Sequence, residues 1–391
     1  MTTQIMTTHS ITTSRPKLLF IVTEDWFFCS HFLPMARAAL SDGFDVAVAC
    51  RERDHGEVIK ALGCRLLPLE ADRKTLNPLA IVSTLLDMRR IIAAEKPAII
   101  HLIALRSIVI GGLAARLAQV HRRVIALTGL GLLGAGSDTK ARLARWGIRC
   151  FIRGVVDGQH ARYLFENRSD PVLLGLQPDD QSKLTIVGGA GVDPDVFRPH
   201  PLPAHPPLKL AMIARMLWSK GADTAVEAMQ LARQAGVDVT LSLYGAPDPA
   251  NPKAIPESTL QAWARMEGIR WHGRIAQQDV PAIWAEHHAA VLPSRGGEGL
   301  PRTLLEAAAC GRAILTTNVP GCRDLVRNDV EGLLVEADDP AGLAHAMTAL
   351  AADPARTAEM GVAARHRILQ GYTEEAVGSA VVGLYRAMLA Q

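Results

Sequence analysis

The chain has few aromatic residues and no long apolar run. Phe, Trp and Tyr together make up 5% of its 391 residues. Charged residues or glycines interrupt every apolar segment before it reaches the roughly 20 residues that a membrane-spanning helix needs, so we expect no such helix. Leu, Ala and Val dominate the apolar fraction, which is 49% of the chain. This composition favours helices packed on a parallel sheet over a β-sandwich.

Cysteine is also scarce. The six cysteines form no Cys-x-x-Cys pair and no zinc-ligand spacing, and most stand in apolar or strand-like segments, which indicates a reducing, cytoplasmic compartment. The first 16 residues are polar and rich in Thr and Ser, without the apolar core of a signal peptide. We therefore expect residues 1–16 to form a disordered tail.

The charge is small in total but unevenly distributed. The formal net charge is +3. Residues 1–200 contain 25 Lys and Arg against 19 Asp and Glu, whereas residues 201–391 contain 17 against 20. The basic excess of the first half is too small to require nucleic acid as a partner. It suits an anionic lipid surface or a phosphate-bearing substrate.

Short apolar strands alternate with helical segments along the whole chain. The strands that we expect lie at 17–23, 45–50, 64–69, 98–102, 124–127, 209–213, 239–244, 269–272, 289–292, 313–316 and 332–335. The alternation predicts an α/β protein with two doubly wound, Rossmann-like domains, each with a parallel sheet covered on both faces. We expect an N-terminal domain at 17–198, a proline-rich linker and hinge at 199–208, and a C-terminal domain at 209–372. Ligands bind in such folds at the carboxyl ends of the strands, here in a cleft between the domains.

The most informative stretch follows the expected strand 289–292. Glu298 lies in a glycine-rich turn, and Glu306 lies eight residues further on, inside a helix that opens near Pro301. The free amides expected at this helix start are those of Gly299, Leu300 and Arg302. They form an anion site beside two carboxylates. A sugar nucleotide satisfies both, with its diphosphate on the amides and its hydroxyls on the carboxylates. The alternative is that Glu298 only caps the helix and Glu306 is solvated.

Two cations follow the first strand of the same domain. Arg215 and Lys220 lie just after the strand 209–213, in the loop and at the next helix start. At the carboxyl end of a strand they are placed to neutralise a leaving diphosphate, Arg as a planar fork and Lys as a point charge. The alternative is that both are ordinary surface cations.

These residues resemble a known family. Glu298 and Glu306 match the E-x7-E motif of the retaining family 4 glycosyltransferases, which have the GT-B fold, and Arg215 and Lys220 match that family's diphosphate-binding pair. The GAGVD turn at 189–193 and the proline-rich linker support the resemblance. Three stretches are similar to bacterial transferases that build polysaccharide or O-antigen units on undecaprenyl diphosphate. These stretches are 101–118, 126–134 and 243–256.

The resemblance implies roles on the donor side. Glu298 is expected to meet the hydroxyls of the donor sugar, and Glu306 to bind the ribose. Arg215 and Lys220 are expected to hold the diphosphate, helped by the amides of the turn. Arg274, in the sequence HGR after a strand, is expected near the nucleotide base. The resemblance indicates uracil, with guanine as the alternative.

The resemblance also implies residues in the N-terminal domain. His101 is expected at a strand end, facing the cleft near the donor sugar; a buried core histidine is the alternative. Segment 24–31 is bulky and aromatic where many members of the family have a Gly-Gly turn. Because it lacks the glycines that allow close approach to a phosphate, we expect this loop to contact acceptor. The acceptor-side candidates are His31, Phe32, Thr128 and Gly129.

A divalent metal is not expected. No Asp-x-Asp motif lies at a strand end facing the cleft, and Asp179 and Asp180 lie in a polar loop. Two cations and a helix N-terminus supply the positive charge that a metal would otherwise bring. We therefore expect a metal-independent reaction without a cofactor.

A basic helix is expected at 139–153. Its arginines recur three and four residues apart and its apolar residues include Leu143 and Trp146; the arginines are Arg142, Arg145, Arg149 and Arg153. A basic, aromatic helix suits the surface of an anionic membrane leaflet. The alternative is an amphipathic helix whose apolar side packs on the sheet. The first interpretation places the protein in the cytoplasm, peripherally on the inner face of the cell membrane.

The last helix is expected to cross back to the N-terminal domain. Apolar residues recur at three- and four-residue steps between 373 and 389, so one side of this helix must be buried. Two-domain transferases that the chain resembles commonly return their last helix across the cleft. We therefore expect Val377, Val381 and Leu384 to contact the first domain.

The function that follows is transfer of a sugar, with retention, from a nucleotide-diphosphate donor, a UDP-sugar, to a lipid-linked glycan. A UDP-sugar 2-epimerase of the same architecture is the alternative enzyme, but the sequence shows no acid and base pair for it. A non-catalytic nucleotide-binding protein and an NAD-dependent dehydrogenase are further alternatives. The turn after the first strand lacks the G-x-G-x-x-G motif that is typical of dinucleotide binding.

Overall fold

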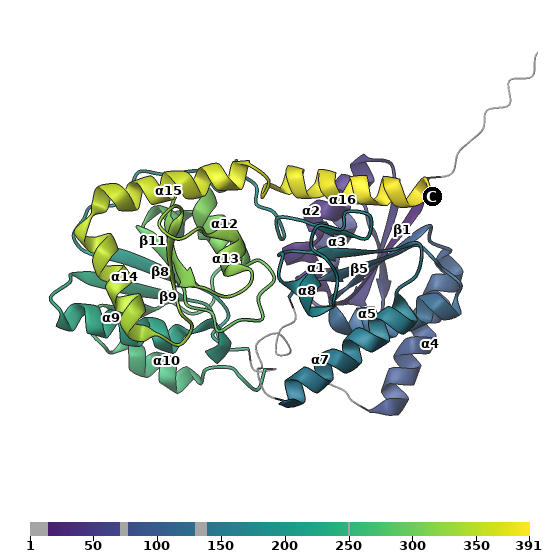
Figure 1. Ribbon diagram of the computed structural model, residues 1–391, viewed down its shortest axis with the longest axis horizontal. Coiled ribbons are helices and arrows are strands. Elements are labelled where there is room, and N and C mark those ends of the chain that lie inside the picture. Colours follow the sequence, from purple (N-terminus) through teal and green to yellow (C-terminus); the bar gives the residue numbers. More distant parts are fainter. Residues whose placement is uncertain (1–14, 71–76, 130–138, 249–250) are drawn as a thin grey trace, which may run out of the picture.

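The computed structural model describes residues 15–70, 77–129, 139–248 and 251–391, which form two α/β domains side by side (Figure 1). The first domain contains a parallel sheet of order β3-β2-β1-β4-β5-β6-β7 and the second a parallel sheet of order β10-β9-β8-β11-β12-β13. This is the predicted fold class. The expected tail lies largely in residues 1–14, and part of the 126–134 stretch and of the 243–256 stretch also lies outside the described residues.

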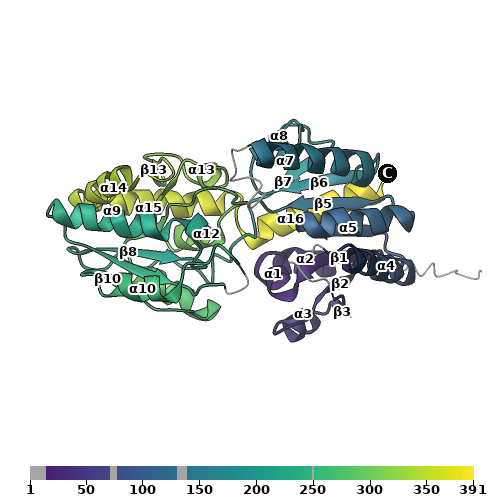
Figure 2. The ribbon, with the colours of Figure 1, turned by 90° about the horizontal axis from the view of Figure 1, so that it is seen from below.

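The first sheet is covered on both faces because its strands are apolar on both sides. The strands are β1 (Lys17–Glu24), β2 (Asp45–Arg51), β3 (Arg65–Pro68), β4 (Ile99–Ile103), β5 (Arg123–Leu127), β6 (Ala161–Phe165) and β7 (Leu184–Ile186). The helices are α1 (Asp25–His31), α2 (Leu33–Ser41), α3 (Gly56–Ala61), α4 (Pro78–Glu95), α5 (Ala104–Leu117), α7 (Thr139–Phe151), a π-helical turn (Ile152–Val156) and α8 (Asp170–Leu173). Helices α4, α5 and α7 lie on one face, and α2 and the last helix, α16 (Glu374–Leu389), lie on the other (Figure 2).

The second domain repeats the same arrangement. Its strands are β8 (Leu208–Ile213), β9 (Val239–Tyr244), β10 (Ile269–Trp271), β11 (Ala289–Leu292), β12 (Ala313–Thr317) and β13 (Gly332–Val335). Its helices are α9 (Ala222–Gln234), α10 (Glu257–Ala264), α11 (Val280–Ala285), α12 (Arg302–Ala309), α13 (Cys322–Leu325), α14 (Pro340–Ala352) and α15 (Pro354–Leu369), with 3-10 turns at Trp218–Lys220 and Gln277–Asp279. Each of the six strands lies within two residues of its predicted position.

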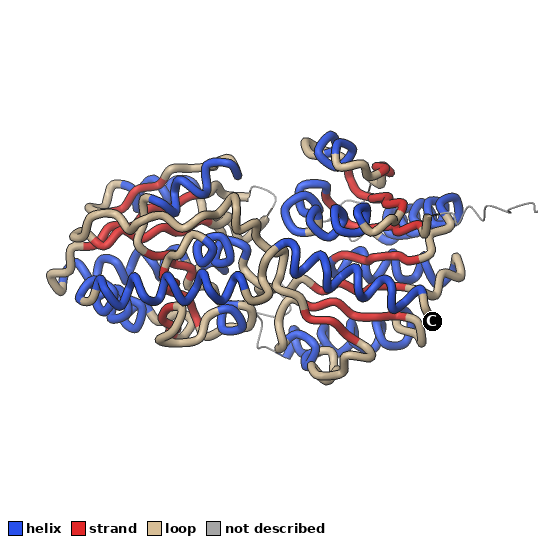
Figure 3. The backbone as a smooth tube through the Cα atoms, turned by 90° about the horizontal axis from the view of Figure 1, so that it is seen from above, coloured by secondary structure: helices blue, strands red, loops and turns tan. Residues whose placement is uncertain are grey.

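Helix α16 crosses from the second domain onto the first (Figure 3). Val377, Val381 and Leu384 are buried in the same apolar cluster as strands β1 and β2 and helix α2, so the predicted contact with the first domain is confirmed. Arg122 of the first domain donates to the main-chain oxygen of Met388 at 2.7 Å. The helix therefore fastens the chain's end to the first domain.

The chain crosses between the domains at two adjacent points. Val192 and Thr373 form a parallel bridge. The main-chain nitrogen of Val192 donates to the oxygen of Tyr372 at 3.0 Å, and that of Glu374 donates to the oxygen of Val192 at 3.1 Å. A Cβ added to Gly191 would lie 2.8 Å from the Cα of Glu374, and φ at Gly191 is +73°. Only glycine therefore allows the two crossings to lie this close, which explains the GAGVD turn.

The proline-rich linker is attached to the second domain rather than free. The main-chain oxygens of Phe197 and His200 accept hydrogen bonds at 2.6 Å from Arg365 and Arg312, respectively. The oxygen of Pro203 lies 3.1 Å from Nε2 of His288. Prolines leave these carbonyls without a strand partner, and side chains of the second domain supply donors. The chain therefore passes between the domains at the paired crossings at 192 and 373 and not along the linker.

Candidate functional site

The site residues all follow carboxyl ends of strands, where the two sheets approach each other. Lys220 follows β8, Arg274 follows β10 and Glu298 follows β11. Segment 25–31 follows β1 of the first domain and is helix α1, not the loop that we expected. Asp25, the first residue of this helix, is buried and accepts from the amide of Trp26 at 2.7 Å and from the amides of Arg53 and His55 at 2.6 and 2.9 Å.

Glu298 and Lys220 form an ion pair at the centre of the site. Nζ of Lys220 lies 2.6 Å from Oε1 and 2.7 Å from Oε2 of Glu298. The hydroxyl of Ser294 donates to Oε1 at 2.7 Å. Burial opposes the negative charge of Glu298, but the charge and hydrogen bond of Lys220 and the bond of Ser294 outweigh it, so the pKa of Glu298 is lowered. Glu298 is therefore a held carboxylate and not the cap of helix α12.

Glu306 is buried on helix α12 and accepts hydrogen bonds from two donors. Nε of Arg302 and Nε2 of Gln277 each lie 2.8 Å from Oε1 of Glu306. Burial raises the pKa of Glu306, and Arg302 and Gln277 oppose that rise. Arg302 also donates to the main-chain oxygen of Ser30 in the first domain. The alternative that Glu306 is a solvated helix residue is wrong, because its side chain is 5% exposed.

Arg215 lies at the boundary between the domains. Its NH1 is 3.4 Å from Oδ2 of Asp248, and its guanidinium carbon is 5.9 Å from the ring centroid of Trp26 on helix α1. Such a distance allows a cation–π contact. The side chain is half-exposed, so Arg215 can reach a ligand without leaving a buried partner.

His31 lies among the cations of the second domain rather than apart from them. Its Nδ1 is 2.6 Å from the hydroxyl of Ser30. Burial and the charges of Arg302, Lys220 and Arg215 lower the pKa of His31 to about 3. We expected His31 on the acceptor side. The structure instead places it near the donor-side cations, and burial and their charges keep the imidazole neutral at ordinary pH.

His101 does not face the cleft. The ring is fully buried inside β4, stacked on Phe20 with centroids 4.9 Å apart. Its Nδ1 lies 2.6 Å from the hydroxyl of Tyr385 on helix α16. The structure therefore corrects the expected catalytic position, because residue 101 lies in the middle of a fully buried strand and not at its end. Phe32 is corrected in the same way, since it is fully buried in the same cluster.

The glycine-rich turn is covered by the first domain. The main-chain nitrogen of Leu300, expected to bind a phosphate, donates to Oε2 of Glu166 at 2.9 Å. A Cβ added to Gly129 would lie 2.5 Å from the nitrogen of Gly299, so Thr128 and Gly129 pack on the turn instead of lining an open acceptor surface. Among the described residues, no side chain caps helix α12, and the amide of Arg302 remains the better candidate for an anion.

Several residues of this site were not predicted. Gln277 lies in a polar stretch whose composition gives no signal, whereas Ser294 lies in the turn after β11 whose glutamate the sequence analysis singled out. Glu166 follows the buried strand β6, which was itself not expected, although an acid directly after an apolar run was a usable signal. Arg274 follows β10 and is exposed; its contact with the nucleotide base stays a prediction.

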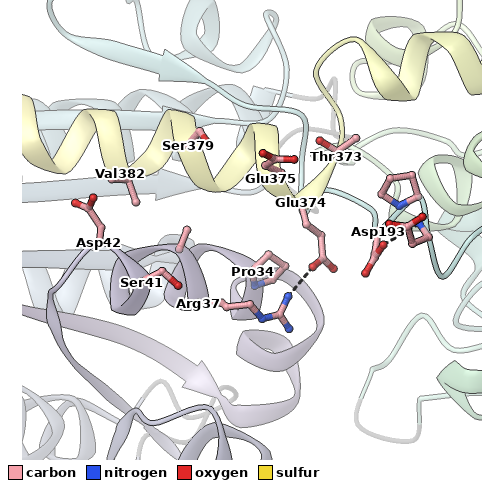
Figure 4. Close-up of a pocket in the computed structure, with 13 residues that line it drawn as sticks. Pro34, Arg37, Ser41, Asp42, Asp193, Thr373, Glu374, Glu375, Ser379 and Val382 are labelled. Carbon is pink, nitrogen blue, oxygen red and sulfur yellow. Dashed lines mark hydrogen bonds and ion pairs between the residues drawn. The ribbon is translucent and has the colours of Figure 1, made fainter.

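A separate cavity lies on the far side of helix α2. It has a volume of about 570 Å³ and is bounded by helix α16 and by the crossing at residues 193–195 (Figure 4). Arg37 forms an ion pair with Glu374 at 2.8 Å across it. The residues of the E-x7-E motif do not line it, so this cavity belongs to the junction of the domains and not to the candidate active site.

Neither a metal centre nor a membrane span is found among the described residues. In that part of the chain, His, Cys, Asp and Glu form no group of three that could hold a metal ion. No described helix is long and apolar enough to cross a membrane.

Comparison with known proteins gives the class to which this geometry belongs. Residues 207–353 match the family described as Glycosyl transferases group 1, and residues 17–151 match the family described as Glycosyl transferase 4-like. One match falls in each domain. The chain belongs to these glycosyltransferases and is an enzyme with the GT-B fold.

A relative aligns along nearly the whole chain. It is the N,N'-diacetylbacillosaminyl-diphospho-undecaprenol alpha-1,3-N-acetylgalactosaminyltransferase of Campylobacter jejuni, 24% identical over 91% of this chain and 94% of the relative. A glycogen synthase of Mycobacterium tuberculosis is 30% identical over 46% of this chain and 43% of its own length. The first of these relatives therefore matches both domains.

Solved structures share the fold. Anabaena Alr3699/HepE, in complex with UDP and glucose, superposes with a TM-score of 0.73 over 95% of this chain and 100% of that chain, at 14% identity. The sucrose-phosphate synthase from Thermosynechococcus elongatus gives a TM-score of 0.76 over 96% and 100%, at 20% identity. At these identities the likeness shows the architecture alone.

Proposed function

We propose that the protein is a retaining glycosyltransferase that moves a sugar from a nucleotide-diphosphate donor, a UDP-sugar, to a glycan on a polyprenyl diphosphate. The observation that carries the proposal is the held carboxylate of Glu298 beside the cations Lys220 and Arg215. The carboxylate offers an acceptor to sugar hydroxyls, and the cations offer charge to the diphosphate as it leaves. The Campylobacter relative is named for an undecaprenol-diphosphate acceptor, which supports the acceptor class.

The experiment is transfer from a panel of UDP- and GDP-sugars to an undecaprenyl-diphosphate-linked glycan, followed by proton NMR of the fresh product. We expect a UDP-sugar with an α-anomeric centre to give an α-linkage, with equal rates with and without EDTA because no metal takes part. A product with the β-anomeric coupling contradicts retention. A donor that changes without any acceptor present contradicts transfer and favours epimerisation.

We further propose that the enzyme works on the inner membrane surface, peripherally, through helices α4 and α7. On α7 the side chains of Leu143 and Trp146 are 66% and 63% exposed. Leu79 on α4 is 80% exposed, and both helices lie on one face of the first sheet (Figure 2). Ile148 packs on the core, so α7 presents apolar residues on both sides and packing alone does not explain its sequence.

Charge on this surface matches an anionic leaflet. Arg142 on α7 and Arg89 and Arg90 on α4 are exposed, and exposed Lys and Arg each contribute about 1 kcal/mol near anionic lipid. We expect Trp146→Glu to reduce sedimentation with phosphatidylglycerol vesicles, while Val362→Glu, at an exposed apolar position of the second domain, leaves it unchanged. Equal loss in both variants would remove the membrane role from α7.

A further inference from the structure

Residues 166–170 of the first domain make a set of specific contacts with the second domain. The segment begins directly after β6 and leads into α8. The amide of Arg168 donates to Oδ1 of Asp324 at 2.9 Å, and the hydroxyl of Ser169 accepts from Arg323 at 3.1 Å. These contacts fix the segment against the start of α13.

Two neighbouring side chains of this segment hold one peptide bond of the glycine-rich turn. Oε2 of Glu166 accepts from the nitrogen of Leu300 at 2.9 Å, and Nδ2 of Asn167 donates to the oxygen of Gly299 at 3.2 Å. The oxygen of Gly299 and the nitrogen of Leu300 belong to the same peptide group. A planar peptide whose two polar groups are both held cannot rotate about its flanking bonds without breaking one of them.

The contact is buried and close. Glu166, Asn167, Gly299 and Leu300 are all buried. A Cβ added to Gly299 would lie 2.0 Å from Oε2 of Glu166 and 2.8 Å from the carbonyl carbon of Thr128, so glycine is required for the first domain to come this near. Buried polar groups that lose their partner cost about 1–3 kcal/mol each, so the turn has a defined orientation in this arrangement of the domains.

We propose that Glu166 and Asn167 are positioning residues that hold the 299–300 peptide, and through it Glu298, in the geometry that the reaction needs. The proposal rests on the proposed function, in which Glu298 meets the donor. The held peptide begins one residue after Glu298, so it limits how far the backbone at Glu298 can move relative to the first domain. Because both residues come from the first domain, the donor loop is correctly shaped only when the domains are together.

The nitrogen of Leu300 requires an acceptor oxygen at residue 166, and the oxygen of Gly299 requires an amide donor at residue 167. Glu166→Gln keeps an acceptor at the same position, whereas Glu166→Ala removes it. Asn167 also orders the turn that leads into α8, because its Oδ1 accepts from the amides of Ser169 and Asp170 at 3.0 and 2.8 Å. Asn167→Ser keeps a side-chain oxygen for this turn and loses the donor that reaches Gly299 and Asp170. Arg168→Ala is the matched control, because that side chain pairs only with the exposed Asp179 among the described residues.

The experiment measures kcat for transfer together with the Kd for UDP. We expect Glu166→Ala and Asn167→Ser to lower kcat by about tenfold to a hundredfold, as small misplacements of reacting groups do, with UDP Kd unchanged. Glu166→Gln and Arg168→Ala should keep kcat near wild type. Wild-type kcat in Glu166→Ala, equal loss in Glu166→Gln, or a UDP affinity that falls as much as kcat would each overturn the positioning role.

A second measurement separates this proposal from the proposed function. Hydrogen exchange of the Leu300 amide in the unliganded protein should be slow in wild type and in Glu166→Gln, and at least tenfold faster in Glu166→Ala. Absence of both UDP binding and transfer in the wild type would refute the proposed function, while the exchange comparison still decides whether the peptide is held. Unchanged exchange in Glu166→Ala refutes the contact itself.

Discussion

The ammonium of Lys220 bridges both carboxylate oxygens of Glu298, at 2.6 and 2.7 Å. The lysine is 18% exposed and the glutamate 13%, so each charge depends on the other more than an exposed pair would. We expected Lys220 to serve the diphosphate and Glu298 to serve the sugar. The pairing links diphosphate binding to sugar binding, because a ligand that displaces Lys220 or Glu298 also displaces its partner.

Removing either partner should therefore reduce turnover by a similar amount. We expect Lys220→Ala and Glu298→Ala each to lower kcat roughly 10²–10³-fold, and the double variant to lose little more than the worse single variant, since the two residues act as a unit. Steady-state kinetics on variants of confirmed fold are the measurement. Arg356→Ala is the control, because it breaks an exposed pair with Asp329 in the same domain. Additive losses would show that the two residues act independently.

Gln277 should matter for donor affinity and not for chemistry. Its amide holds Glu306, the expected ribose ligand, at 2.8 Å, and a ribose contact changes little along the reaction. We expect Gln277→Ala to weaken UDP binding about threefold to tenfold, the equivalent of one modest hydrogen bond, with kcat retained. Calorimetric titration with UDP is the measurement. The control is Gln278→Ala, at the exposed neighbouring residue. If Gln278→Ala weakens UDP equally, the contact to Glu306 is not the cause.

Local patterns in the sequence predicted the features that depend on residues close together in the chain. The six strands of the second domain and the buried stripe of α16 are visible because their apolar periodicity is strong. Strand β6 was missed because Ala161–Phe165 contains an arginine and a tyrosine between two polar loops. Pairings across the domains were beyond reach: Glu166 and Leu300 are 134 residues apart. Nothing in the single sequence distinguishes a histidine that faces a cleft from His101, which faces Tyr385.

The contact between Tyr385 and His101 should support stability and not catalysis. Both side chains are fully buried, and among the described residues Nε2 of His101 has no partner. Tyr385→Phe leaves Nδ1 unpaired as well, which should cost about 1–3 kcal/mol and lower the melting temperature by several degrees. We expect kcat per folded molecule to stay at wild type. A large fall in kcat at unchanged melting temperature would show that His101 has a role in the reaction.

Glu166 should make stability depend on pH in a direction opposite to that of most carboxylates. Burial, together with Asp170 and Glu298, raises the pKa of Glu166 to about 8, while the Leu300 amide opposes the rise. Between its ordinary pKa of 4.5 and that value, the folded state binds more protons than the unfolded state, so this group lowers stability as pH rises. Below pH 4.5 both states are protonated and the penalty is absent.

The comparison of wild type with Glu166→Gln isolates this effect, because other titrating groups are common to both. We expect nearly equal melting temperatures near pH 4.5, and a variant that becomes progressively more stable than wild type up to pH 8–9. A difference of about 1 kcal/mol would appear as roughly 2–4 °C for a domain of this size. The variant keeps an acceptor for the Leu300 amide, so lost hydrogen bonding does not mask the charge. A gap that stays constant with pH, or that favours wild type as pH rises, would show that Glu166 titrates normally.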